Sequence, residues 1–150
     1  MNSPLLWFSL HLPTHSLDVH FPHWPAEARP AAVLLQDRIR VCTPAASAKG
    51  VKPGMRSSTA LGLAPDILLV PDRAQARRDR LEEIALCLLQ YTPKVAFFQE
   101  QDLLLEAGAS LSLFHGARRL HGRIRASLEA MQARARIGMA PTALGAWMLA

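Results

Sequence analysis

The stretch KVAFFQEQDLLLEA, residues 94–107, decides how the rest of the chain is interpreted. Two apolar runs, KVAFFQ at 94–99 and DLLLEA at 102–107, flank the polar pair Glu100–Gln101. Short apolar runs on either side of a brief polar break predict a β-hairpin. Acids also surround the leucines of the second run, and carboxylates are the ligands that magnesium prefers. The hairpin is therefore a candidate metal site, or the place of a former one.

Helices are predicted on both sides of the hairpin. The upstream helix should run from an N-cap at Asp72 to about Gln90, and the downstream helix from Gly116 to Gln132. Each has apolar residues three and four positions apart, which places them on one buried face. These inner positions are Leu81, Ile84, Ala85 and Leu88 in the first helix, and Leu120, Ile124, Leu128 and Met131 in the second.

Strands are predicted near the two ends of the chain. Residues 5–12 form an apolar run, and residues 133–140 precede Thr142, a suitable cap for a final helix that includes Trp147. With residues 13–71 set aside, the order is strand, helix, strand, strand, helix, strand. This order predicts the α+β class, as a βαββαβ unit with an antiparallel sheet and helices on one face.

Residues 13–71 are predicted to be an insertion after the first strand, so that residues 1–12 and 72–150 form the main body. The expected elements of the insertion are strands at 31–36, 38–44 and 66–71, a turn at Gln36–Asp37, and a short helix at 57–63.

Composition indicates a globular protein with a basic surface. The chain has 150 residues, a net charge of +5 and a pI near 10.0. This charge suits an anionic partner such as nucleic acid, and a basic surface without such a partner fits it as well. No apolar run reaches membrane-spanning length and no signal peptide is evident, so we expect a cytoplasmic protein without a membrane partner. Cys42 and Cys87 lack CxxC spacing and should be buried thiols.

Several short motifs, together with the βαββαβ order, resemble the Y-family translesion DNA polymerases. The motifs are GVKPGM at 50–55, YTPKV at 91–95 and RIGMAPTALGAWMLA at 136–150. The resemblance implies a polymerase palm, with residues 13–71 as the fingers. The stretches LLLEAGASLSLFHG at 103–116 and IGMAPTALGAWMLA at 137–150 look like the ImuB branch of that family.

The resemblance also implies where catalytic carboxylates would lie. Polymerases transfer a phosphoryl group with two metal ions held by carboxylates. Active Y-family members have acids at two first-strand positions, which fall on Ser9 and His11 here, and an adjacent Asp-Glu pair, which falls on Gln101 and Asp102. Only Asp102 is an anionic oxygen ligand. Glu106 matches a downstream acid that is not a catalytic ligand.

Residues that grip the triphosphate in the family are replaced as well. A Tyr and an Arg of the fingers fall on Pro44 and Ser47, and a palm lysine falls on Ala143. Each charged phosphate contact contributes roughly 1.5–3 kcal/mol. The resemblance therefore predicts no catalytic, nucleotide-binding or metal site, and no cofactor.

The function implied by the resemblance is a non-catalytic scaffold in damage-induced (SOS) mutagenesis and translesion synthesis. Partners expected for a full-length protein of this branch are an error-prone replicative-type polymerase, a RecA-like ImuA-type protein and the sliding clamp. The family's little finger and C-terminal tail lie outside these residues, and the apolar ending AWMLA (146–150) suggests a chain cut from a longer one.

Two rival functions stay open. An active, divergent polymerase would use magnesium and would need acids from elsewhere, such as Asp18 or Glu100 through a shifted register. A protein-interaction module with no DNA role would use the palm helices or the final helix.

Basic side chains are the candidates for weak DNA contacts. They are Lys49, Lys52 and Arg56 in the insertion, and Arg118, Arg119 and Arg123 in the second helix. A solvated basic face explains them equally well. Four arginines crowd the first turns of the first helix and oppose its dipole, namely Arg73, Arg77, Arg78 and Arg80. Either phosphate contact or pairing with Asp79, Glu82 and Glu83 should account for them.

Two other clusters have weaker support. His15, His20 and His23 with Asp18 include zinc-ligand types, but their spacing matches no standard zinc pattern. Ser9, His11 and Asp18 include the residue types of a hydrolase, but no GxSxG-like elbow is present. We therefore expect capping or solvated histidines here.

Overall fold

The structure is a computed structural model that describes residues 5–22, 24 and 29–150. The chain forms two compact units, which we call the major unit (1–13 with 78–150) and the inserted unit (14–77). Helix α4 (Ala74–Leu88) runs across this boundary. The inserted unit therefore includes the first residues of a helix that the sequence assigned wholly to the main body.

The major unit contains a four-stranded antiparallel sheet in the order β5-β6-β1-β7. Its strands are β1 (Trp7–His11), β5 (Val95–Phe98), β6 (Asp102–Glu106) and β7 (Arg136–Ala140). Helix α4 follows β1, and helix α5 (Ala117–Ala130) follows β6 after a short 3-10 turn, η1 (Gly108–Ser110). The predicted α+β class and βαββαβ order are confirmed.

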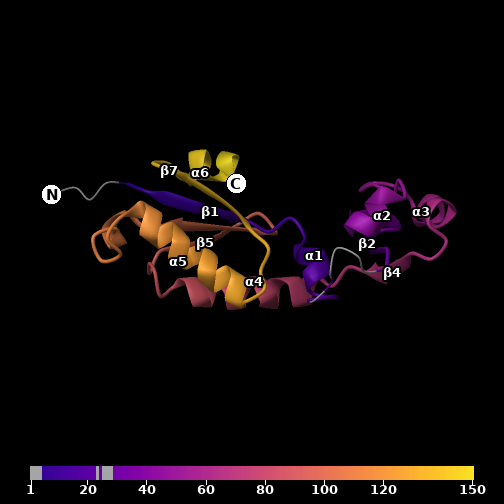
Figure 1. Cartoon of the computed structure of the whole chain (residues 1–150), viewed down its shortest axis with the longest axis horizontal. Helices are drawn as coiled ribbons and strands as arrows, with labels where there is room; N and C mark the ends of the chain where they lie inside the picture. Colours follow the sequence, from indigo (N-terminus) through magenta and orange to yellow (C-terminus); the bar gives the residue numbers. More distant parts are fainter. Residues whose placement is uncertain (1–4, 23, 25–28) are drawn as a thin grey trace. The chain divides into compact units, whose positions relative to one another are not determined.

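The core of the major unit lies between the sheet and helices α4 and α5 (Figure 1). From the sheet, Phe8, Leu10, Leu103 and Leu105 are fully buried. The predicted inner faces of both helices are buried, except that Met131 is half-buried. Alternation along each strand then leaves the other residues of β1 and β6 on the opposite face.

Helix α6 (Ala143–Leu149) covers part of that opposite face, against β7 and β1 (Figure 1). Its predicted cap is confirmed, because the Gly145 N–H donates to Thr142 Oγ1 at 3.1 Å. A Cβ atom at Gly138 of β7 would lie 1.9 Å from the carbonyl oxygen of Ala146. Only glycine allows the α6 backbone to approach the strand this closely.

The inserted unit contains a three-stranded sheet in the order β3-β2-β4. Its strands are β2 (Ala31–Leu35), β3 (Arg38–Cys42) and β4 (Leu68–Pro71), and its helices are α1 (His15–Asp18), α2 (Pro44–Ala48) and α3 (Ser57–Leu63). Gln36 and Asp37 turn β2 into β3 with φ values of 50° and 62°. The predicted turn and the helix at 57–63 are confirmed, and the turn has the positive φ values of a type I′ hairpin.

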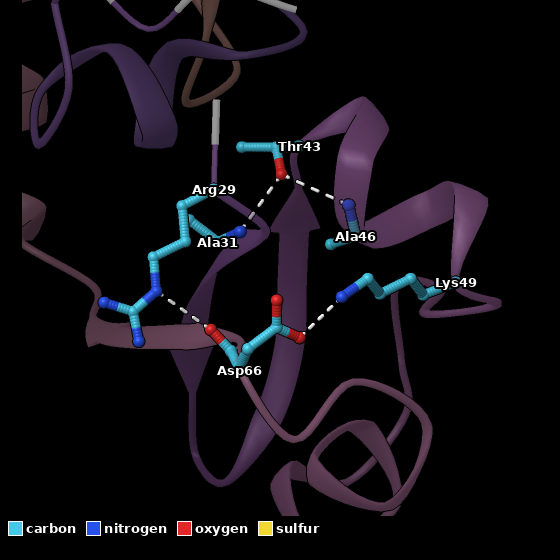
Figure 2. Close-up of polar contacts among 6 residues, drawn as sticks. All are labelled: Arg29, Ala31, Thr43, Ala46, Lys49 and Asp66. Carbon is cyan, nitrogen blue, oxygen red and sulfur yellow. Dashed lines mark hydrogen bonds and ion pairs between the residues drawn. The ribbon is translucent and has the colours of Figure 1, made fainter. Parts of the chain in front are cut away.

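The structure corrects the expected strand at 38–44. The strand ends at Cys42, and α2 begins at Pro44 behind Thr43. Thr43 Oγ1 accepts from the N–H groups of Ala46 at 3.4 Å and Ala31 at 3.0 Å (Figure 2). A Thr-Pro pair suits the N-cap and first position of a helix, and this signal was overlooked.

Two further predicted features differ in detail. The hairpin turn spans Gln99 to Gln101, because Phe98 pairs with Asp102 and Gln99 has a φ of 58°. Asp72 lies two residues before α4, and its carboxylate accepts from Arg77 Nε at 2.9 Å and Nη2 at 3.0 Å. Asp72 therefore binds a buried arginine in place of its predicted N-cap role.

Of the helices in the described ranges, none is long and apolar enough to cross a lipid bilayer. Cys42 and Cys87 are free thiols, and they are half-buried where full burial was expected. Burial raises the pKa of the Cys42 thiol.

Replacement of Gly138 by Ala should destabilise the major unit, because the new methyl group would meet the α6 backbone. We expect a loss of about 1–3 kcal/mol in the free energy of unfolding, measured by urea denaturation. Gly122→Ala in α5 is the matched control, since nothing lies within 4 Å of its Cβ position. That variant should gain about 0.5–1 kcal/mol. Equal effects at the two positions would contradict the packing of α6 on β7.

Candidate functional site

The side chains of His11 and Asp102 meet on the face of the major sheet opposite the α4/α5 core. The register of β1 and β6 places the two residues directly opposite each other. His11 Nδ1 lies 2.7 Å from Asp102 Oδ1, within hydrogen-bond distance. The Asp102 side chain is only 4% exposed, whereas that of His11 is 26% exposed. The imidazole of His11 therefore lies against one oxygen of the Asp102 carboxylate.

Ser9 lies on the same face of β1, between Leu104 of β6 and Gly138 of β7. It is fully buried, and its Oγ has no hydrogen-bond partner within the described part of the chain. A serine hydroxyl that no base contacts is not an activated nucleophile. The hydrolase interpretation of Ser9, His11 and Asp18 therefore has no geometric support.

Glu100 and Gln101, the two turn residues before Asp102, differ in their burial. Glu100 is exposed in the turn, and Gln101 is half-buried there with its carbonyl oxygen accepting from the Leu12 N–H at 3.0 Å. This register pairs Asp102, and not Glu100, with the first strand.

Glu106, at the end of β6, belongs to a separate buried network. Its carboxylate accepts from Lys94 Nζ at 2.6 Å and from the Gly108 N–H at 2.9 Å, and its backbone oxygen accepts from Thr92 Oγ1 at 2.6 Å. Tyr91 adds a hydrogen bond from its hydroxyl to the Arg123 carbonyl at 3.0 Å. The motif at 91–95 thus ties the hairpin to its surroundings, a role that sequence reasoning missed.

The three positions expected to hold a triphosphate carry no charge. Pro44 and Ser47 are exposed on α2, three residues apart and hence on neighbouring parts of one helix side. Ala143 is the first residue of α6 and is half-buried. A pyrrolidine ring, a hydroxyl and a methyl group provide no cation for a triphosphate.

The candidate DNA contacts in the inserted unit differ in their surroundings. Lys49 Nζ lies 2.6 Å from Asp66 Oδ1, and Arg29 Nε donates to the Asp66 backbone oxygen at 3.0 Å (Figure 2). Lys49 lowers the pKa of the Asp66 carboxyl group through this hydrogen bond. Lys52 and Arg56 are exposed. An incoming phosphate would therefore compete with Asp66 for Lys49 but not for Lys52.

The arginines of the two long helices also fall into different classes. Arg118 and Arg119 are exposed at the start of α5, and Arg123 lies 5.6 Å from the centre of the Phe114 ring. Arg77 is buried and bound to Asp72, an acid outside the predicted set of partners. Arg80 Nη1 donates to Glu83 at 2.8 Å, so the predicted pairing is confirmed for Arg80. Arg73 and Arg78 are exposed.

Among the residues that the structure describes, His15, Asp18 and His20 have different surroundings. His15 is buried, with Nε2 2.7 Å from the Arg77 carbonyl oxygen. Asp18 accepts from Thr14 Oγ1 at 2.8 Å and from Trp24 Nε1 at 3.1 Å. His20 Nε2 is buried without a partner among the described residues, and His23 lies outside them. No set of three or more His, Cys, Asp or Glu within the described ranges is arranged to hold a metal ion.

Comparisons with known proteins identify the family. The profile described as the impB/mucB/samB family matches residues 25–150. The chain belongs to this family. A comparison with curated protein sequences gave no significant match.

Solved structures share the fold. DinB from Sulfolobus solfataricus matches with a TM-score of 0.79 and 19% identity. A Dbh ternary complex matches with a TM-score of 0.77 and 20% identity, and an insertion ternary complex of Dbh DNA polymerase with 0.78 and 19%. Each alignment covers 95% of this chain and 44% of the solved chain, so this chain spans less than half the length of those polymerases.

The family fold implies a two-metal site, and the donor set on this sheet face does not fit one. Magnesium prefers several anionic or neutral oxygens in octahedral geometry. The face offers the Asp102 carboxylate, already in contact with His11, the Glu106 carboxylate, already bound by Lys94 and the Gly108 N–H, and the buried hydroxyl of Ser9. Two carboxylates at opposite ends of β6, each already bound to other groups, are a poor set of ligands for two magnesium ions.

Glu106 should make stability depend on pH in the acidic range. Its hydrogen bonds with Lys94 and Gly108 hold the pKa of the Glu106 carboxyl group below its ordinary value. A lowered folded-state pKa stabilises the fold above the unfolded pKa of about 4.3, and this contribution is lost as pH falls through the folded-state pKa. At neutral pH the free energy of unfolding of wild type, measured by urea denaturation, should exceed that of Glu106→Gln by about 1 kcal/mol. This difference in free energy should shrink below pH ~4.3.

Lys94→Met is the matched control for this prediction. The Lys94 side chain is 68% exposed, so its loss should cost less than about 1 kcal/mol. A gap between wild type and Glu106→Gln that stays constant from neutral to acidic pH would refute the assigned role.

Proposed function

We propose that this chain is the palm-and-fingers portion of a non-catalytic, ImuB-like subunit that acts as a scaffold in damage-induced translesion DNA synthesis. The observation that carries the proposal is the contact between His11 and Asp102. This contact joins two positions at which active members of the family are expected to have carboxylates that are free to bind metal ions. The fold is retained while the donor set has changed.

The charges expected around the incoming nucleotide support the same proposal. Positions 44, 47 and 143 carry Pro, Ser and Ala, which leaves the triphosphate without the cations that would balance it. Pro44 and Ser47 both lie on helix α2, whose N-terminus is capped by Thr43. The three positions lie on two separate helices, α2 and α6. A shift in one segment of the chain could explain the loss of a single acid, but it would not explain changes on both helices.

The scaffold role concerns DNA and other proteins. The basic surface suits weak, salt-sensitive contact with DNA phosphates. In the longer natural protein, we propose that a replicative-type error-prone polymerase, the sliding clamp and a RecA-like protein are brought together at damaged DNA. The palm and fingers would then align the assembly on a primer terminus without performing the transfer.

Primer extension by the longer natural protein tests the loss of chemistry. Both wild type and Asp102→Ala should show no incorporation with magnesium or manganese, at least about a thousandfold below an active Y-family polymerase on the same template. This factor corresponds to the several kcal/mol that metal ions supply to phosphoryl transfer. Incorporation that disappears in Asp102→Ala would mean that the hairpin holds a catalytic metal, and the scaffold proposal would fail.

Salt titration of DNA binding tests the proposed contacts. This chain should bind a primer-template duplex weakly, with an affinity that falls steeply as NaCl rises, measured by fluorescence anisotropy. Lys52→Gln/Arg56→Gln and Arg118→Gln/Arg119→Gln should each weaken binding and reduce the salt slope by roughly 1–2, since each phosphate contact contributes about 0.9.

The double variant Lys49→Gln/Asp66→Asn is the matched control for the titration. It removes a cation together with the anion that already binds it, so the net charge and the slope should stay nearly unchanged. Tight binding that does not respond to salt, or slopes that no variant alters, would contradict these contacts.

A further inference from the structure

An apolar groove lies between helix α4 and the outer strand β5 of the major sheet. Its volume is about 300 Å³. The lining residues are Glu82, Ala85, Leu86 and Leu89 from α4, and Val95 and Phe97 from β5. Leu86 is 67% exposed and Phe97 is 56% exposed. Large apolar side chains that gather around one groove, in place of being scattered singly, are typical of an interaction site.

The groove continues into the open edge of the sheet. Within the described sheet, β5 pairs only with β6. The Glu106 N–H donates to the Lys94 carbonyl oxygen at 3.0 Å, which makes this a hydrogen-bonded pair of the ladder. Hydrogen-bonded and non-bonded pairs alternate in an antiparallel ladder, so the N–H and C=O groups of Val95 and Phe97 point away from β6. The same two residues therefore offer apolar side chains to the groove and free backbone groups at the edge.

The usual protection of such an edge is weak here. Edge strands are normally blunted by short length, by proline, by outward lysines or by a covering segment, and of these β5 itself has only its four-residue length. The strand itself is Val-Ala-Phe-Phe and contains no proline or lysine. Lys94, just before the strand, forms an ion pair with Glu106. An apolar strand of this kind, with an open groove beside it, is suited to accept one more strand.

Charge indicates what kind of segment fits. The Glu82 carboxylate stands at the wall of the groove, and its side chain has no hydrogen bond or ion pair to any residue that the structure describes. The neighbouring Glu83 is bound by Arg80 at 2.8 Å, and Lys94 is bound by Glu106. A second copy of this edge would bring another Glu82 and no uncommitted lysine beside it. A cation for Glu82 is more readily supplied by a different protein.

We propose that the groove and the β5 edge bind an extended segment of a partner protein as an added strand. The segment would place apolar side chains at alternate positions over Leu86 and Phe97, and a Lys or Arg near Glu82. Backbone hydrogen bonds to Val95 and Phe97 would supply affinity, and the alternate side chains would supply specificity. The proposal does not depend on DNA binding or on the loss of catalysis.

Selection from a displayed library of random peptides, each of about nine residues, tests the proposal on the 150-residue chain. Enriched peptides should show apolar residues at alternate positions with a nearby Lys or Arg. A synthetic peptide of the enriched sequence should shift the backbone amide resonances of β5. Its affinity should fall by about tenfold or more for Phe97→Asp and for Leu86→Asp, both at exposed positions that tolerate the change in the free chain.

The controls separate charge, groove and folding. Glu82→Lys should lower the affinity for the selected basic peptide. A peptide with Glu in place of its Lys should bind this variant more tightly than the original peptide does. Leu113→Asp changes a leucine that is 72% exposed but does not line the groove, and it should leave binding unchanged.

Several outcomes would overturn the proposal. One is enrichment of peptides that are acidic or that bind without shifting β5. Another is a failure of the library to enrich any peptide above background. A third is concentration-dependent dimerisation in analytical ultracentrifugation that Phe97→Asp abolishes, which would assign the edge to a second copy of the chain.

Discussion

The pairing of β1 between β6 and β7 is the constraint on which the rest of the major unit depends. The strand is five residues long, and its partners come from the hairpin and from the end of the chain. Because side chains alternate along a strand, this one register sends Phe8 and Leu10 into the helical core and turns Ser9 and His11 to the other face. A shift of one residue would exchange the two sets. The same register therefore specifies both the core and the candidate site.

This separation of faces places different requirements on the two sides of the sheet. The core face depends on volume and burial, which the family's βαββαβ arrangement requires of any sequence. The opposite face tolerates new chemistry if buried polar groups stay satisfied. At Asp102 the imidazole of His11 meets this need, while the buried hydroxyl of Ser9 is left without a partner in the described chain. The packing of the core therefore does not depend on which polar residues stand on the opposite face.

Charges in this protein are often committed to local structure, which narrows the surfaces left for partners. Asp72 binds Arg77, Glu106 binds Lys94, and Asp66 binds Lys49. A high pI is therefore a poor guide to which cations face DNA. The α4/β5 groove shows the reverse situation, since its apolar walls and its single carboxylate are not used by the described chain.

The sequence by itself determined the βαββαβ order and the buried helix faces through the periodicity of its apolar residues. Its turn and capping residues determined the Gln36–Asp37 turn and the Thr142 cap. These features are set by local steric and hydrogen-bonding rules. The start of helix α2 also follows from a local signal, the pair Thr43–Pro44, although the sequence was interpreted as a strand there. Tertiary structure alone decided that Asp72 binds Arg77 and that Asp102, not Glu100, meets His11. Those contacts depend on strand register and on burial, which bring together groups that no sequence spacing relates.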